Sequence, residues 1–142
     1  MIGTRIDTAR PWNWEGNVQA VVVDFLSKNG YKISQVANTA IFEKGKDIVA
    51  ITPNGKTLWV SVKGWPSGTR STRPNTQARN WFSRALFDII LYRDEDPTVE
   101  LALAFPDGYT TYLNLAKRIG WFKKSTKLQI FWVSENGAIR IE

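Results

Sequence analysis

The chain has 142 residues, 43% of them hydrophobic, and a formal net charge of +6, which suits one folded domain over residues 1–142 with a real core. It contains no Cys and no His. Disulfide frameworks, thiolate or imidazole metal sites and Ser-His catalytic triads are therefore excluded. Any hydrolytic chemistry must use carboxylates, lysine, hydroxyls and an oxygen-binding cation such as Mg²⁺.

The basic charge balance favours a polyanionic partner, although basic solubility alone would explain as much. No apolar run approaches the ~20 residues that a membrane span needs. Residues 1–14 also lack the apolar core of a signal peptide. We therefore expect a soluble, cytoplasmic domain with no membrane partner.

The first predicted element is a helix over residues 14–28 that follows an irregular lead-in. Asn13 is a suitable N-cap, and Asn29-Gly30 would end the helix. Apolar residues recur along it at helical spacing: Trp14, Val18, Val21, Val22, Phe25 and Leu26. Residues 31–36 then predict a short strand, and residues 38–46 a second strand or a loop.

A hairpin follows, with strands over 47–52 and 56–63 joined around Pro53-Asn54-Gly55. Pro followed by Asn fits the centre of a type I turn, and Gly supplies the left-handed residue of a three-residue loop with a bulge. In that register Asp47 faces Ser61. One face is then wholly apolar (Ile48, Ala50, Leu58, Val60, Val62), and the other carries Asp47, Ser61 and Lys63 at its open end.

The rest of the chain continues the mixed pattern. Residues 64–73 form a Gly/Ser/Thr/Arg loop, and Pro74 opens a helix to about residue 92. Its inward residues are Ala78, Phe82, Ala85, Leu86 and Ile89. Further along are a buried strand (99–105), a helix (109–122) and a final strand pair (127–133 and 138–141). The order α-β-β-β-α-β-α-β-β indicates an α/β sandwich with a mixed sheet.

Forty consecutive residues, 48–87, contain no Asp or Glu. Within this acid-free stretch lie six basic residues: Lys56, Lys63, Arg70, Arg73, Arg79 and Arg84. Because no acid balances them, we expect Arg70, Arg73, Arg79 and Arg84 to contact the phosphates of a nucleic acid rather than to form only a solvated face. Trp65 is a candidate for stacking on an unpaired base, whereas Trp81 is expected to pack on the core.

These residues together resemble a known superfamily. Asp47, a short hairpin, Ser61-Val62-Lys63-Gly64 and then Gln77-Ala78-Arg79-Asn80-Trp81 on the next helix resemble the PD-(D/E)XK, or restriction-endonuclease-like, nucleases. The resemblance covers residues 14–133. It implies an αβββαβ core with a mixed sheet flanked by helices, and Mg²⁺- or Mn²⁺-dependent endonuclease or exonuclease cleavage of DNA or RNA.

The resemblance also implies roles for individual residues. Asp47 and the Val62 carbonyl would bind the metal, and Lys63 would orient the attacking water and stabilise the charged transition state. Glu15 would match a first-helix glutamate and serve as a further metal ligand. Gln77 would match a helix glutamine of exonuclease-like branches. Ser61 stands where the motif has Glu or Asp, so Glu15 is the replacement carboxylate.

Each of these residues also has a purely structural interpretation. Asp47 and Lys63 would then form an exposed cross-strand ion pair, and Glu15 would only interact with the helix dipole. Ser61 is better read as an ordinary strand serine than as a nucleophile, because no base is available to activate it. Gln77 would be a solvated helix residue.

Two hypotheses from different classes therefore remain. The first is a metal-dependent nuclease, most simply one that cuts DNA. The second is a degenerate nuclease fold that binds nucleic acid or a protein partner without cutting, which Ser61 favours. With one domain available, sequence specificity would come from DNA shape, a homodimer or a protein partner.

Overall fold

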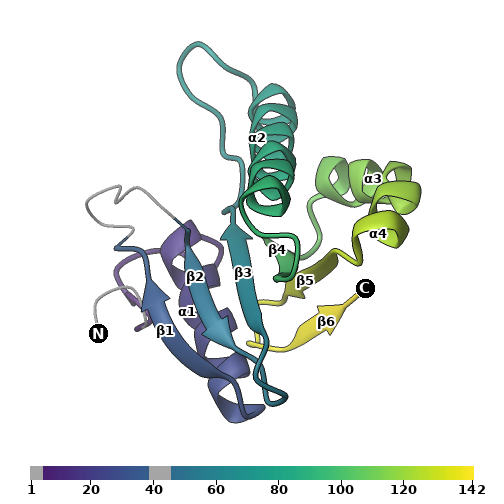
Figure 1. Ribbon diagram of the computed structural model, residues 1–142. Coiled ribbons are helices and arrows are strands. Elements are labelled where there is room, and N and C mark those ends of the chain that lie inside the picture. The colour runs from purple at the N-terminus through teal and green to yellow at the C-terminus, as the bar shows by residue number, and fades with distance from the viewer. Residues whose placement is uncertain (1–4, 39–45) are drawn as a thin grey trace.

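The computed structural model describes residues 5–38 and 46–142. Within these ranges the strands form one six-stranded sheet in the order β1-β2-β3-β4-β5-β6 (Figure 1). The strands are β1 (Lys32–Val36), β2 (Ile48–Ile51), β3 (Thr57–Val62), β4 (Glu100–Pro106), β5 (Gln129–Val133) and β6 (Ile139–Ile141). β4 pairs in parallel with β3 and β5, and the other pairs are antiparallel. The predicted α/β class with a mixed sheet is confirmed.

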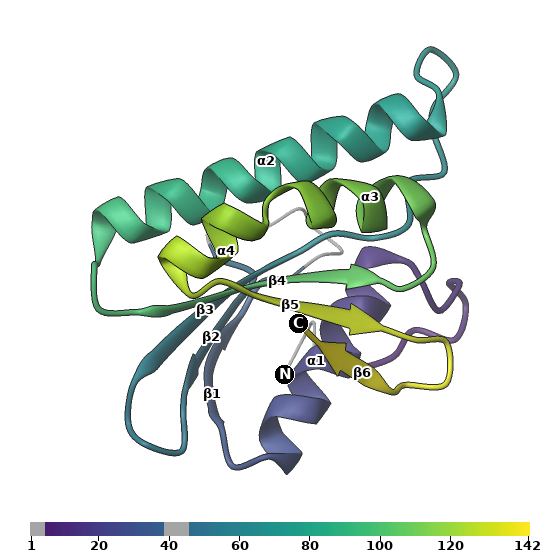
Figure 2. The same cartoon turned by 90° about the vertical axis from the view of Figure 1, so that its right-hand side faces the viewer.

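Helices cover both faces of the sheet (Figure 2). α1 (Glu15–Lys28) lies on one face, and α2 (Pro74–Glu95), α3 (Thr110–Arg118) and α4 (Gly120–Thr126) lie on the other. Each face has its own hydrophobic core. From α1 to β4 the described elements follow the order α-β-β-β-α-β.

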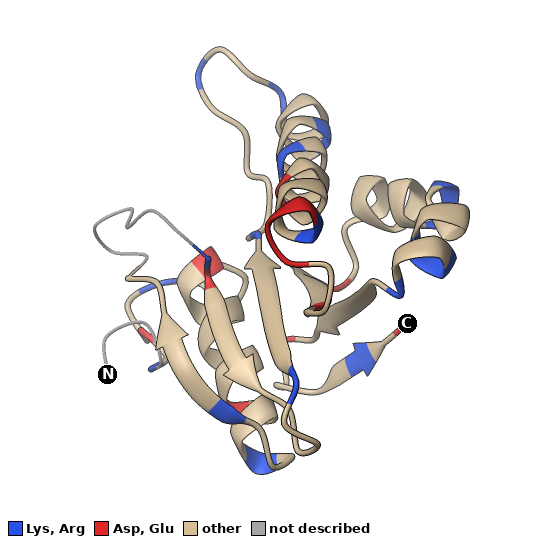
Figure 3. Ribbon diagram, in the orientation of Figure 1, with Lys and Arg blue, Asp and Glu red and all other residues tan. Residues whose placement is uncertain are grey.

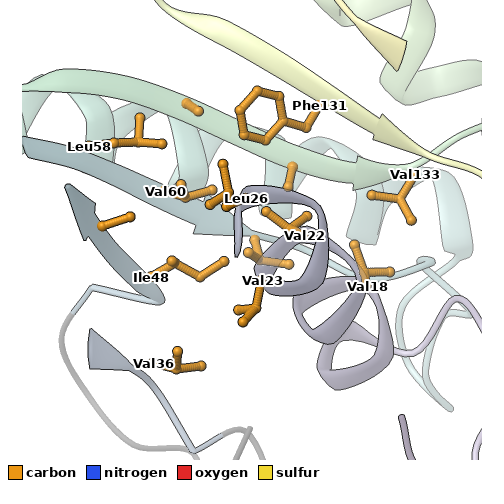
Figure 4. Close-up of a cluster of buried hydrophobic side chains, with 14 residues drawn as sticks. Val18, Val22, Val23, Leu26, Val36, Ile48, Leu58, Val60, Phe131 and Val133 are labelled. Atoms are coloured by element: carbon orange, nitrogen blue, oxygen red, sulfur yellow. The ribbon is translucent and has the colours of Figure 1, made fainter. Parts of the chain in front are cut away.

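The core under α1 is aliphatic for the most part. Figure 4 shows Val22 and Leu26 of α1 lying against Val60 of β3. The predicted stripe is confirmed except at Trp14, which lies outside this core. Val18, Val22 and Leu26 are fully buried, and Val21 and Phe25 pack partly against the same core. Burying a side chain of this size contributes roughly 1.5–3 kcal/mol, so this face stabilises the sheet.

The predicted N-cap of α1 was wrong by one residue. Trp14 is the N-cap and makes no side-chain capping hydrogen bond. The Asn13 carbonyl instead accepts a hydrogen bond from the Trp65 N–H at 2.9 Å. The loop after β3 therefore runs against the start of α1, next to the residue that precedes the N-cap.

The hairpin register is confirmed. Gly55 has a φ of 87°, the left-handed conformation that the turn requires, and Thr52 N–H donates to the Lys56 carbonyl at 2.7 Å. Ile51 then pairs with Thr57, and Val49 with Trp59. The predicted apolar face is buried throughout: Ile48, Ala50, Leu58, Val60 and Val62. Of the preceding segment, residues 39–45 lie outside the described residues.

The core under α2 and α3 is rich in aromatic rings, including a stacked pair, Phe82 and Phe105, with centroids 5.3 Å apart. Ala78, Phe82, Ala85 and Ile89 are buried as predicted, and Leu86 is partly buried. The prediction of a single helix over 109–122 was wrong: the helix is interrupted at Ile119 (φ −106°, ψ 22°), which lies between α3 and α4. Gly120 disfavours helix continuation, and Ile119 and Phe122 both pack on this core across the break.

α2 changes character along its exposed side. Arg79 and Arg84 are exposed in its first half, whereas the exposed side chains that follow include Phe87, Ile90 and Leu91. None of the helices in the described ranges is both long and apolar enough to cross a membrane.

Candidate functional site

The open end of the hairpin brings Asp47 and Lys63 together. Asp47 directly precedes β2, and Lys63 directly follows β3. The Val62 N–H donates to the Asp47 Oδ2 at 2.6 Å, so the carboxylate closes the end of the β2–β3 ladder. The Lys63 N–H donates to the Ala104 carbonyl at 3.0 Å, which continues the pairing of β3 with β4. Both residues are therefore fixed through the backbone of the central strands.

Glu15 reaches the same place from the first turn of α1. An added Cβ on Gly64 would lie only 2.6 Å from the Glu15 backbone nitrogen, so only glycine permits this approach. The Tyr112 hydroxyl, itself buried, donates to the Gly64 carbonyl at 2.9 Å and holds the loop from the other face. The helix start and the strand end are thus pressed together beside Lys63.

Glu15 interacts electrostatically with both Asp47 and Lys63. Burial, and to a smaller extent the negative charge of Asp47, raise the pKa of Glu15 to about 7 against the opposing effect of Lys63. Burial also raises the pKa of Asp47 to about 6, against the Val62 N–H and Lys63. The surroundings of both carboxyl groups therefore disfavour their ionised forms, and Lys63 partly offsets this effect.

Asp88 of α2 is a further member that sequence reasoning missed. Burial raises its pKa, and the positive charge of Lys63 counteracts the shift. Its negative charge also raises the pKa of Asp47. Two signals could have found it. Asp88 is the acid that ends the acid-free stretch, and it follows the buried Ala85 by three residues, on the same side of the helix.

The Lys63 ammonium group has no ion-pair partner among the described residues, and the ion pairs present there lie elsewhere. Asp47 and Lys63 form no ion pair in the described part of the chain; the Asp47 carboxylate accepts a hydrogen bond from the Val62 N–H, and Lys63 interacts with it electrostatically. The ammonium group interacts electrostatically with three acids: Glu15, Asp47 and Asp88.

Ser61 and Gln77 have structural surroundings. Ser61 is only 1% exposed, and it pairs with Leu103 of β4. Gln77 is not merely solvated, since its Oε1 accepts a hydrogen bond from the Gly68 N–H at 2.8 Å and so holds the loop 64–73. Their catalytic roles stay predictions.

The basic residues extend away from this site along the loop 64–73 and α2 (Figure 3). Arg70 and Arg73 are exposed and line a shallow hollow of about 350 Å³. Backbone and side-chain hydrogen bonds of Thr69 to Ser71 and Thr72 shape this loop. No Asp or Glu occurs from the loop through residue 87 of α2, so this part of the surface offers phosphate contacts without repulsion from acids of its own segment.

The tryptophans differ in their packing. Trp81 packs partly against the core, as predicted. Trp65 is in neither hydrophobic core; its ring meets Tyr109 edge-on, with centroids 4.9 Å apart and an interplanar angle of 89°. The indole is therefore held in place yet remains partly exposed, as a stacking platform would require.

The acids suit a hard cation with few protein ligands. Among the described residues no group of three acids lies close enough to hold a metal ion. Mg²⁺ needs no such cage, since it is commonly bound by one or two carboxylates and keeps several waters. Asp47 and Glu15 could supply those two carboxylates, and an ionised pair would lose its mutual repulsion on binding the cation.

No protein-family model matches this chain, and neither the curated proteins nor the solved structures contain a match. The family resemblance therefore rests on the motif residues and on the order of the elements. It stays a prediction, while the site geometry stands independently of it.

Proposed function

We propose that this protein is a Mg²⁺-dependent nuclease with a restriction-endonuclease-like fold, which hydrolyses phosphodiester bonds of DNA or RNA. One observation carries the proposal. Glu15 and Asp47, from different elements, meet beside Lys63 with their pKa values raised to about 7 and about 6. Carboxyl groups held in such surroundings cost stability, and clusters of this kind concentrate at functional sites.

Asp47 and Glu15 would hold the metal, together with the Val62 carbonyl implied by the family motif. The ion would act as a Lewis acid and lower the pKa of a bound water. The Val62 N–H fixes one oxygen of Asp47, which limits rotation of the carboxylate. Metal binding requires ionised acids, so the apparent Mg²⁺ affinity should rise as the pH increases through 6 and 7.

Lys63 would act on the substrate rather than on the metal. Its ammonium group can donate to a phosphate oxygen because no ion pair among the described residues engages it. Preorganised positive charge of this kind stabilises the negative charge that develops as water attacks phosphorus and the bond to the leaving oxygen breaks. Arg70 and Arg73 would guide the strand along the adjoining loop.

The alternative is a nuclease fold that binds nucleic acid, or a protein partner, without cutting. The buried Ser61 favours it, because a motif position that ordinarily carries an acid is here neutral and enclosed. In that case the acids and Lys63 would be remnants of a site, and the basic loop would be the functional surface.

Nicking of supercoiled plasmid and cleavage of single-stranded oligonucleotides, with Mg²⁺ or Mn²⁺, separate these functions. The wild type should cut, and Asp47→Asn should not. Asp24→Asn, which changes an exposed Asp in an i,i+4 pair with Lys28 on α1, is the matched control and should cut normally. A wild type that binds DNA but is inert with both metals would overturn the nuclease proposal.

Ser61→Glu tests whether the site lacks only a carboxylate. In a working site the new acid should tighten Mn²⁺ binding and increase cleavage. In a degenerate site it should destabilise the metal-free protein, since it adds a third acid to a buried pair, without any gain in cleavage. Calorimetric metal titration alongside the nicking assay distinguishes the two results.

A further inference from the structure

A pocket of about 300 Å³ opens beside the first turn of α1, and three tryptophans from separate parts of the chain line it: Trp14, Trp65 and Trp81. Arg10, Glu15 and Gly64 also contribute to it. We call it the tryptophan pocket. Its volume is at the lower end of the ~300–1,000 Å³ typical of small-ligand sites.

Two of these rings do not serve the hydrophobic cores. Trp14 and Trp65 are partly exposed and belong to neither core cluster. Trp81 contributes to the core and also borders the pocket. A large aromatic ring that borders a cavity and is not enclosed by the core can stack on a flat ligand there.

The rings are nevertheless held in position. The Arg10 guanidinium carbon lies 4.6 Å from the centroid of the Trp14 ring, a cation–π contact. Tyr109 supports Trp65 edge-on. The hydrogen bond from the Trp65 N–H to the Asn13 carbonyl at 2.9 Å ties these two walls together. A flat aromatic ligand would thus meet preorganised faces and one cation.

The tryptophan pocket shares a wall with the candidate active site. Glu15 lines the pocket and also interacts electrostatically with Asp47 and Lys63. Gly64, next to Lys63, lines it as well. A phosphate held by Lys63 would therefore have its neighbouring nucleoside beside the pocket.

We infer that the tryptophan pocket binds an unpaired nucleobase adjacent to the phosphate that is cut. Bases paired within a duplex are stacked on one another, so a base can enter only from a single strand, a frayed end or a flipped position. This inference rests on the proposed function and narrows its substrate to nucleic acid with at least one unpaired nucleotide.

Binding of fluorescent oligonucleotides in EDTA, where no metal-dependent cutting occurs, tests the inference. Three probes are compared by anisotropy: a short oligothymidylate, the same backbone carrying abasic residues, and a blunt duplex. Wild type should bind the oligothymidylate about 10-fold more tightly than the abasic strand, since stacking of one base is worth ~1–3 kcal/mol. Equal affinity for the two strands, or no binding of either, would overturn the inference.

Variants locate the base within the protein. Trp14→Ala and Trp65→Ala should each bind oligothymidylate nearly as weakly as the abasic strand, while affinity for the abasic strand stays unchanged. Trp121→Ala is the matched control, because this α4 tryptophan is 73% exposed and lies outside the pocket. If Trp14→Ala and Trp65→Ala both keep the wild-type preference, the base does not stack there and the inference fails.

The outcome is separable from that of the proposed function. If the protein prefers unpaired bases but never nicks DNA, the inference about the tryptophan pocket stands and the proposed nuclease function fails. If the protein cuts in an Asp47-dependent manner but binds abasic and base-carrying strands equally, the proposed nuclease function stands and the inference about the tryptophan pocket fails.

Discussion

The two ends of the β2–β3 hairpin follow opposite rules. At the turn end, Pro53-Asn54-Gly55 is exposed, and its geometry is set within a few residues by the Gly55 conformation and the Thr52–Lys56 hydrogen bond. At the open end, Asp47 and Lys63 are partly buried and interact with Glu15 of α1 and Asp88 of α2. Local interactions determine the geometry of the turn end. Contacts between distant segments form the open end, where burial disfavours the ionised acids.

The difference shows how a small fold can separate stability from chemistry. The turn end and the aliphatic face under α1 stabilise the sheet without any ionisable group among the core side chains. The open end gathers acids whose ionisation the protein interior opposes. Mutations at the turn end should therefore change stability alone, and mutations at the open end should change function, in some cases while raising stability.

The largest effect should come from Lys63, and Lys56 at the other end of β3 provides the comparison. We expect Lys63→Ala to lower the rate of cleavage by about 10²–10³-fold, the usual cost of losing one preorganised group that stabilises developing charge. Lys56→Ala, at the turn end, should leave the rate unchanged. Single-turnover cleavage with both variants, after thermal melts verify their folding, makes the comparison. Equal loss in both would show that the lysines act only through general attraction of nucleic acid.

Next in size is the contact between the loop and α1. Gly64→Ala should destabilise the fold by about 2–3 kcal/mol, because the added Cβ would lie 2.6 Å from the Glu15 nitrogen. Metal affinity should fall with it, since Glu15 would be pushed from Asp47. Gly120→Ala is the control, as a Cβ there meets no atom within 4 Å. Urea unfolding and Mn²⁺ titration measure the two effects, and a Gly64 variant as stable as wild type would contradict the close approach.

The strain at the open end should be visible as a pH effect. The pKa of Glu15 is about 7 in the folded protein, above its ordinary 4.5, so the folded state binds protons more tightly than the unfolded state. Its stabilising contribution is full below pH 4.5 and is lost as the pH rises through 7. Glu15→Gln should therefore raise the free energy of unfolding by about 3 kcal/mol at pH 8 in EDTA, and by almost nothing at pH 4.5.

The control for this experiment is Glu135→Gln, an exposed position between β5 and β6, which should be neutral at both pH values. Urea denaturation in EDTA across pH 4.5–8 gives the curves. Adding Mg²⁺ at pH 8 should stabilise the wild type more than Glu15→Gln, because only the wild type keeps both carboxylates. A pH-independent difference between the two proteins would mean that Glu15 is solvated rather than strained.

The smallest effect belongs to the turn. Gly55→Ala should cost about 1 kcal/mol, because φ is 87° there and an L-residue resists the left-handed conformation. No atom lies within 4 Å of the added Cβ, so strain is the whole effect. Cleavage and Mn²⁺ affinity should match the wild type. A loss of metal affinity would show that the two ends of the hairpin are coupled.

The same division explains what the sequence could predict. The hairpin register followed from Pro53-Asn54-Gly55 and the apolar alternation, both of which are local. That register brings Asp47 and Lys63 to the same end of the hairpin, where they interact electrostatically. Asp88 was missed because its proximity depends on how α2 crosses the sheet, which no short-range pattern encodes.

The errors have the same origin. At the start of α1 the Asn13–Trp65 hydrogen bond joins segments 52 residues apart in the numbering, and the N-cap makes no side-chain capping hydrogen bond. The break at Ile119 lets Phe122 pack on the core of the α2 face, although the residues around it form helices on both sides. In each case tertiary contacts outweighed a local preference of at most about 1 kcal/mol.

The parallel pairing of β3 with β4 also has a consequence for folding during synthesis. Lys63 is anchored to the Ala104 carbonyl, and the connection between these strands must pass through the whole of α2. Such non-local pairing forms late and slowly. A growing polypeptide on the ribosome would contain Asp47 and Lys63 long before β4 could fix their positions, so the proposed site should form only once synthesis has passed β4. Products truncated before β4 would then lack the assembled site, a result that arises from topology alone.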